Sequence, residues 1–223
     1  LNVAGYKAYK SVNPAPTVTV VVANTVTVGS TINGTAAADT LLSGAGNDTL
    51  IGGDGLDIVD YSRTVASVGA GMVTVSSSVG MSIDLENQTA QTTNANASVF
   101  GVDRLISIEG VQTGRGNDSV MGSSGANLIV TDLGTDTVGS ADTVNGNGGA
   151  DTIITGAGND VIYYNPLASI NAGTGADTLR ISGADTNMTT ATGVVSNIEI
   201  IDLGTDPGGN HLTLNDDNVA AMG

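Results

Sequence analysis

The chain has 223 residues, with 22 acidic and 6 basic side chains, a net charge of −16, 32 glycines, one phenylalanine and neither cysteine nor tryptophan. So few lysines and arginines argue against a nucleic-acid partner, and no apolar run approaches the roughly 20 residues of a membrane span. The shortage of bulky side chains favours a thin stacked core, and the lack of cysteine excludes disulfides as its staple.

Residues 1–33 are predicted to form an N-terminal arm and the first strands. The segment SVNPAPT (11–17) is punctuated by proline, and TVTVVVANTVTVGSTIN (17–33) alternates β-branched and other residues as one or two strands do. Ile32 is in phase with Leu41, nine residues later. Residues 1–16 have two interpretations, a linker or an arm that adds a strand to a neighbouring subunit.

A nine-residue repeat fills residues 34–60 in three adjacent copies and returns between residues 113 and 180. The copies are GTAAADTLL (34–42), SGAGNDTLI (43–51), GGDGLDIVD (52–60), TGRGNDSVM (113–121), GNGGADTII (146–154), TGAGNDVIY (155–163) and AGTGADTLR (172–180). Tandem copies in one register indicate a repeat architecture. Glycines at the first, second and fourth positions are expected to give tight turns with positive φ. Aliphatic residues at the eighth position are expected to point inward from very short strands.

The sixth position of the repeat supplies a carboxylate to each turn. Free backbone carbonyls and a carboxylate are hard oxygen ligands, which suit calcium. In GSSGANLIV (122–130), Asn127 replaces the expected aspartate, so the sequence predicts a weaker or empty site there. The sixth-position candidates are Asp39, Asp48, Asp57, Asp118, Asp151, Asp160 and Asp177.

The repeat resembles the calcium-binding nonapeptide of the RTX proteins. This resemblance implies an all-β fold, a right-handed parallel β-roll in which two nonapeptides make one coil and calcium lies between turns about 18 residues apart. It pairs Asp39 with Asp57, Asp118 with Asp136, and Asp142 with Asp160. Because Asp160 and Asp177 are 17 residues apart and Asp136 and Asp142 only six, the coils there are expected to bulge or shift.

Residues 61–112 interrupt the repeat and separate a first block (34–60) from a second block (113–180). The segment MVTVSSSVGMSIDLENQTAQTT (72–93) alternates like strands joined by a polar turn, which predicts a β insert within the same sheet system. The segments DYS (60–62), IDL (83–85) and DRLISIE (103–109) resemble an insert of large RTX surface proteins. Two roles are considered for Glu109, a calcium ligand and a turn-stabilising hydrogen bond.

Residues 181–223 are predicted to cap the roll. Strands are expected at 197–203 and 211–214, followed by a short helical or irregular end that Asn215 or Asp216 caps. The segment resembles the terminal element of RTX adhesins, and it would cover the last open coil. Asp206, with neighbouring oxygen donors, is either a further calcium ligand or part of a plain turn.

The motifs favour a function other than catalysis. The single histidine, His211, is followed by alternating LTL, and the sequences HExxH, GxSxG and GxxxxGK[ST] do not occur. The resemblance implies a calcium-binding structural protein of the bacterial cell surface or extracellular matrix, such as an S-layer, filament or matrix subunit. Such a subunit would leave a Gram-negative cell by type I secretion, fold with calcium outside and self-assemble into sheets or filaments.

Other functions stay open. Cell-surface polysaccharide is a possible further partner of such a subunit. The main alternative is an RTX module of a larger secreted adhesin or enzyme. Ice binding is a distant third, because the third repeat position does not form the regular threonine and asparagine array that it needs.

Overall fold

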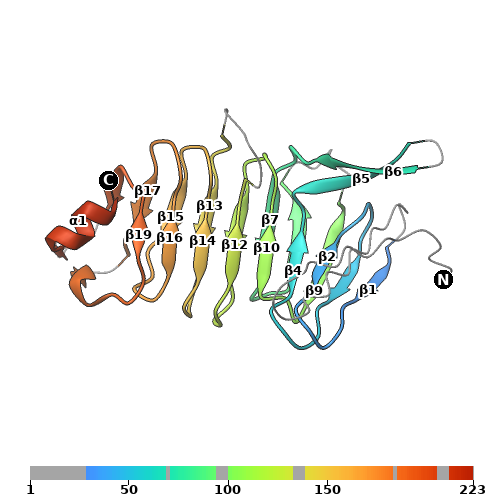
Figure 1. The fold of residues 1–223 in the computed structure, drawn as a ribbon, viewed down its shortest axis with the longest axis horizontal. Helices are drawn as coiled ribbons and strands as arrows, with labels where there is room; N and C mark the ends of the chain where they lie inside the picture. The colour runs from blue at the N-terminus through green and yellow to red at the C-terminus, as the bar shows by residue number, and fades with distance from the viewer. Residues whose placement is uncertain are drawn as a thin grey trace, which may run out of the picture.

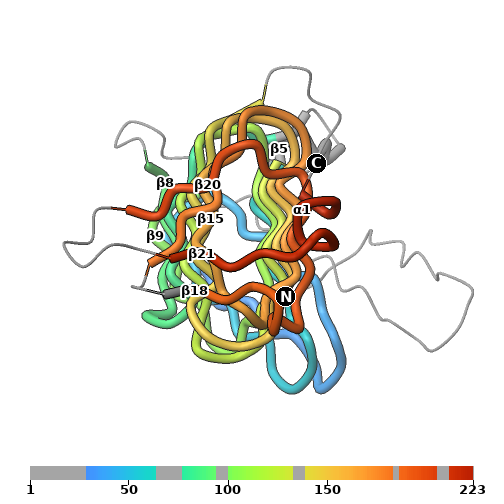
Figure 2. The backbone as a smooth tube through the Cα atoms, turned by 90° about the vertical axis from the view of Figure 1, so that its left-hand side faces the viewer, coloured from blue at the N-terminus to red at the C-terminus, as the bar shows by residue number. Residues whose placement is uncertain are grey.

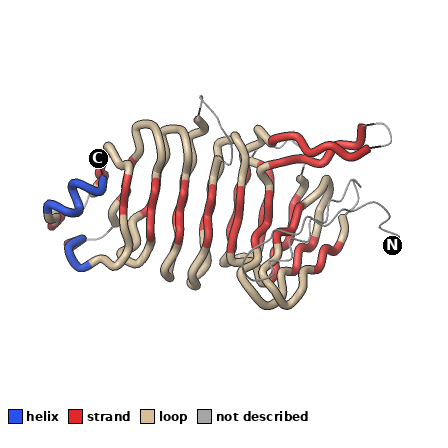
Figure 3. The backbone as a smooth tube through the Cα atoms, in the orientation of Figure 1, coloured by secondary structure: helices blue, strands red, loops and turns tan. Residues whose placement is uncertain are grey.

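The computed structural model describes residues 29–68, 71–93, 100–132, 139–182, 185–204 and 211–222. These residues form an elongated stack of coils, and the end-on view shows two facing columns of backbone (Figure 1 and Figure 2). Short strands alternate with loops along the stack, and the α-helix lies at its C-terminal end (Figure 3). The predicted all-β parallel β-roll is therefore confirmed.

In the described residues, two sheets make the walls of the roll. The first has ten strands, in the spatial order β1 (Thr31–Asn33), β3 (Thr49–Ile51), β9 (Val102–Ile106), β8 (Thr89–Thr92), β7 (Met81–Asp84), β11 (Ser119–Met121), β13 (Thr143–Asn145), β15 (Val161–Tyr163), β17 (Thr178–Arg180) and β20 (Ile200–Asp202). The second has seven, in the order β19 (Val195–Ser196), β16 (Ser169–Asn171), β14 (Thr152–Ile154), β12 (Leu128–Val130), β10 (Gly110–Gln112), β4 (Ile58–Asp60) and β2 (Thr40–Leu42). Every pair of neighbours is parallel except the two that involve β8.

The core is a column of single side chains, one from each short strand. Most strands have three residues, so the middle side chain points inward while its two neighbours face outward. The middle residues are at most 3% exposed, which confirms the inward direction predicted for the eighth repeat position. They are Ile32, Leu41, Leu50, Val59, Val111, Val120, Ile129, Val144, Ile153, Ile162, Ile170 and Leu179.

Coils of different length keep their strands in register. Leu41 lies opposite Val59 in a regular 18-residue coil, and Val120 lies opposite Val144 across a longer one. The additional residues of that longer coil fall in the connection between β12 and β13, part of which lies outside the described residues. The coil that is one residue short loses its residue from the turn at 164–168, where Asn165 Nδ2 donates to Gly149 O at 2.9 Å. Turns therefore absorb the irregularities that the sequence predicts.

The insert contributes to the roll and also projects from it. Strands β7, β8 and β9 join the first sheet, with β8 antiparallel to both neighbours. Strands β5 (Arg63–Val68) and β6 (Gly71–Ser76) instead form a separate antiparallel hairpin that leaves the stack (Figure 1). Tyr61, which precedes β5, and Phe100, which precedes β9, pack edge to face in the core with ring centroids 5.2 Å apart.

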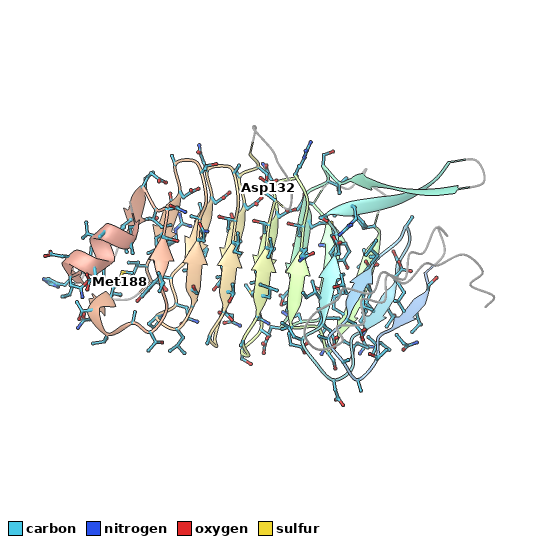
Figure 4. The ribbon with its side chains drawn as sticks, in the orientation of Figure 1. Asp132 and Met188 are labelled. Carbon is cyan, nitrogen blue, oxygen red and sulfur yellow. The ribbon has the colours of Figure 1, made fainter. Side chains whose placement is uncertain are left out.

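The C-terminal segment lies across the last coil. Helix α1 (Asp216–Met222) begins after Asn215, whose Oδ1 accepts a hydrogen bond from Asn218 N at 2.8 Å. Its last residue is tied to the roll, because Ile198 N donates to Met222 O at 2.9 Å. Met188, in the 3₁₀ helix η1 (Met188–Thr190), is buried near α1 (Figure 4). Neither α1 nor any other helix of the described residues is long and apolar enough to cross a membrane.

A small parallel sheet accompanies this cap. Strands β18 (Asp185–Asn187) and β21 (His211–Thr213) pair outside the two walls of the roll. The predicted strands at 197–203 and 211–214 correspond to β20 and β21, whereas β18 and β19 have no counterpart among the predicted elements.

Candidate metal centre

The turns of the roll stack in two rows along its length. Edge one is the row that leads into the seven-stranded sheet, and edge two is the row that leads into the ten-stranded sheet. The edge-one turns span residues 34–39, 52–57, 107–109, 122–127 and 146–151. The edge-two turns span residues 43–48, 113–118, 139–142, 155–160 and 172–177, and Asp103, near the start of β9, takes the corresponding place in the insert.

A ladder of carboxylates runs along each edge. On edge two, Asp142 N donates to Asp160 Oδ1 at 2.8 Å, and Asp160 N donates to Asp177 Oδ1 at 2.8 Å. On edge one, Asp39 N donates to Asp57 Oδ1 at 2.8 Å. Each of these carboxylates thus holds the backbone of the preceding coil with one oxygen. The ladder places the two pairs Asp39–Asp57 and Asp142–Asp160 together, as the resemblance implies.

The expected pairing of Asp118 with Asp136 is wrong. Asp118 N donates to Asp142 Oδ1 at 2.9 Å, so Asp142 is the ladder partner of Asp118. The coil that contains Asp118 has 24 residues, so a fixed spacing of 18 residues selects the wrong residue. Asp136 itself lies outside the described residues, as does Asp206.

The second oxygen of most ladder aspartates is buried and accepts no hydrogen bond of regular geometry, although hydroxyl groups lie near the carboxylates of Asp118, Asp142 and Asp160. In water this oxygen would be solvated, so leaving it unpaired in the protein is costly unless a cation binds it. Among the described residues, the oxygens in this state are Asp39 Oδ1 and the Oδ2 atoms of Asp57, Asp118, Asp142, Asp151, Asp160 and Asp177.

Carbonyl oxygens converge on the same places at edge one. A Cβ atom added to Gly52 would lie 2.0 Å from Ser107 O and 2.6 Å from the unpaired Asp57 Oδ2, so only glycine fits there. The first-position glycines therefore serve for space and not, as predicted, for positive φ. Positive φ occurs at the second and fourth positions, for example 89° at Gly173 and 151° at Gly175.

The residues present fit calcium. Calcium takes six to eight oxygen ligands in flexible geometry. The described residues contain no cluster of three or more His, Cys, Asp or Glu side chains, so carboxylates supply only part of such a shell and backbone carbonyls must supply the rest. Bound calcium would provide the positive charge that the unpaired oxygens lack.

Burial raises the pKa values of several ladder carboxylates in the calcium-free chain. The pKa of Asp118 rises to about 8, and those of Asp160 and Asp177 rise to about 6, because desolvation disfavours their charged forms. The pKa of Asp142 is raised for the same reason. Nearby like charges add to the effect. Without calcium, the ladder is therefore under electrostatic strain at neutral pH.

We expect acid to favour folding of the calcium-free chain. Carboxylates with raised pKa stabilise the fold fully only below their unfolded pKa, about 3.9, and that stability is lost as pH rises through about 6 to 8. In EGTA, far-UV circular dichroism should show more β structure at pH 5 than at pH 8. Less β structure at pH 5 would show that the buried carboxylates are not what destabilises the calcium-free chain.

In one pair of ladder aspartates, Asp48 and Asp103, every carboxylate oxygen accepts a hydrogen bond from the protein. Asp103 accepts from Asp48 N at 2.8 Å through Oδ1, and from Ser43 Oγ at 2.6 Å and Tyr61 Oη at 2.9 Å through Oδ2. Asp48 Oδ1 accepts from Ser30 N, and its Oδ2 accepts from Gly44 N at 3.4 Å. Asp48 was a predicted ligand, but no oxygen of this pair is left without a partner. The hydroxyl groups of Ser43 and Tyr61 donate to the Asp103 oxygen whose counterparts in most other ladder aspartates lack a partner.

Replacing Tyr61 by phenylalanine tests this network. The change removes one of the two hydroxyl donors to the buried Asp103 carboxylate and should cost about 1–3 kcal/mol of unfolding free energy. Urea denaturation at two saturating calcium concentrations should give the same loss. A loss that shrinks as calcium rises would mean that this network also binds the ion.

The amide of Asn127 likewise makes only protein contacts. Its Oδ1 accepts from Ser123 N at 2.7 Å, and its Nδ2 donates to Glu109 O at 3.1 Å. This arrangement is consistent with a weaker or empty site at Asn127.

Other edge residues were missed by sequence reasoning. A second ladder on edge two uses the fifth repeat position, where Asn47, Asn117 and Asn159 Oδ1 accept from the next coil at 2.9–3.1 Å. The signal was present, since asparagine takes the fifth position only in edge-two copies. Asp132 Oδ2 accepts from Ala157 N at 3.2 Å and lies at the edge of the stack in Figure 4. Nothing in the repeat pattern marks Asp132.

Comparison with protein families agrees with this geometry. The model of the RTX calcium-binding nonapeptide repeat, in four copies, matches residues 31–62, 111–138 and 139–165. These three stretches are therefore RTX repeats, which are calcium-binding motifs. A search of curated proteins finds no match.

Proposed function

We propose that the chain is a calcium-folded structural subunit of the bacterial cell surface or extracellular matrix, belonging to an S-layer, filament or matrix. The carrying observation is the distribution of buried unpaired carboxylate oxygens, which extends from Asp39 to Asp177 along almost the whole described roll. Metal ligands spread in this way support a scaffold rather than one reacting centre. RTX repeats are typical of secreted proteins, and calcium is available outside the cell.

A non-catalytic role is part of this proposal. A cavity of about 360 Å³ on edge two is lined by glycine, alanine, threonine and asparagine from stacked turns, including Gly158, Asn159 and Thr174. These side chains offer neither a general base nor an activated nucleophile. His211 is exposed on β21, away from the carboxylate ladder.

A second candidate is a module of a larger secreted adhesin or enzyme, and the N-terminal end of the roll is relevant to both candidates. Within the described residues, β1 and β2 are the outermost strands of their sheets at that end. Their outer edges can accept another coil, whether from more of the same chain or from a second copy. The same feature therefore serves a module and a self-assembling subunit.

Imaging and size-exclusion chromatography separate the two candidates. The full chain should be examined at saturating calcium and again after chelation with EGTA. Sheets or filaments that form with calcium and dissolve without it would support the structural subunit. Monomers across the calcium range and at high protein concentration would reject it in favour of the module.

A further inference from the structure

We propose that a calcium site lies outside the nonapeptide pattern, where Glu109 and Ser107 of the insert meet the turn formed by residues 52–57. The site would join the first repeat block to the second across the insert. Ser107 and Glu109 fall between the stretches matched by the RTX repeat, 31–62 and 111–138, so the repeat does not assign them a ligand role.

Asp57 provides the buried, unsatisfied ligand. Its side chain is fully buried, its Oδ1 accepts from Asp39 N at 2.8 Å, and its Oδ2 accepts no hydrogen bond. A Cβ atom added to Gly52 would lie 2.6 Å from this Oδ2 and 2.0 Å from Ser107 O. The unpaired carboxylate oxygen and a carbonyl of the insert thus converge beside the same glycine.

The local backbone of the insert explains this convergence. Ser107 has a left-handed φ of 50°, which is rare for a residue other than glycine, and it turns the chain sharply ahead of β10. The turn at 107–109 is shorter than a nonapeptide turn. Glutamate, one methylene longer than aspartate, still reaches the ladder, and Glu109 Oε2 accepts from Asp57 N at 3.0 Å. Glu109 N and Gly110 N both donate to Asp57 O.

Charge and connectivity favour calcium on one side of this turn only. On the side of Asp57, the carboxylates of Asp57 and Glu109 and the Ser107 carbonyl make a set of hard oxygen ligands. Toward the next coil, Asn127 Nδ2 already donates to Glu109 O at 3.1 Å, so the protein closes that side. The cation would therefore link segments that are 52 positions apart in the chain.

The variant Glu109→Gln tests the site, because glutamine keeps an oxygen that can accept from Asp57 N but removes the charge. Glu86→Gln is the matched control, since Glu86 Oε2 accepts from Ser124 N at 2.9 Å and is exposed. Isothermal titration calorimetry of the full chain with calcium chloride should show one fewer bound ion, or one site weakened about tenfold, for Glu109→Gln alone. An unchanged titration for Glu109→Gln would overturn the proposal.

Hydrogen exchange in the parent chain gives a second test that does not depend on a variant folding. Above the calcium midpoint for folding, further calcium should slow exchange at the Glu109 and Gly110 amides, which bond to Asp57 O. Exchange at these amides that does not change between partial and full calcium saturation would contradict the site. Glu109 would then act only through its hydrogen bond.

Discussion

Chelation of calcium with EGTA is expected to unfold the roll at neutral pH. At a calcium concentration ten times the dissociation constant, each independent site adds about 1.4 kcal/mol to the free energy of unfolding. About six such sites would give about 8 kcal/mol, which is comparable to the whole stability of a typical domain. The net charge of −16 and the buried carboxylates oppose compaction once calcium is removed.

Far-UV circular dichroism measures this loss, and EGTA that is already saturated with calcium serves as the control. The control should leave the spectrum unchanged. A β-rich spectrum with cooperative thermal unfolding in excess EGTA would show that side-chain packing alone holds the roll together.

Replacing Leu50 by alanine is expected to lower stability by about 2–5 kcal/mol at saturating calcium. Leu50 is fully buried in the middle of β3, and its neighbours in the core column are Ile32 and Leu105. Truncation leaves a cavity in a core that is one side chain thick, so there is little room for repacking. Urea denaturation measures the loss, and a change below about 0.5 kcal/mol would show that the column is not well packed.

The sequence predicts the regular part of the fold because one repeat encodes both the turn and the inward side chain. Leu41, Val59 and Ile162 lie where the eighth position places them. The spacing of 18 residues also brings Asp39 to Asp57. Such features depend on residues a few positions apart, and a single copy of the motif contains them all.

The irregular contacts could not be predicted because they join segments far apart in the chain. The side chain of Tyr61 meets Asp103 only after the insert returns to the roll, and no local pattern specifies that contact. A longer coil likewise moved the partner of Asp118 from Asp136 to Asp142. The short turn at 107–109 lets Glu109 take the place of an aspartate in the ladder, and this turn also depends on the path of the insert.

A glutamate also takes an aspartate position of the ladder at the C-terminal end of the roll. Asp177 N donates to Glu199 Oε2 at 2.8 Å, and Asn197, two residues before Glu199, has a φ of 57°. The segments SIE (107–109) and NIE (197–199) therefore share a left-handed residue followed by a ladder glutamate. Ala172 stands where Gly52 stands in the first case, so a Cβ atom fills the corresponding space.

A calcium titration of the variant Asp160→Asn tests the central claim most directly. Asparagine keeps an oxygen to accept from Asp142 N, but it removes the charge from an Oδ2 position that is buried and unpaired. Followed by far-UV circular dichroism, the calcium midpoint of folding should rise about tenfold, which corresponds to about 1.4 kcal/mol. The variant Asn127→Asp should leave the midpoint unchanged or lower it. If Asp160→Asn titrates like the parent chain, the ladder carboxylates do not bind calcium.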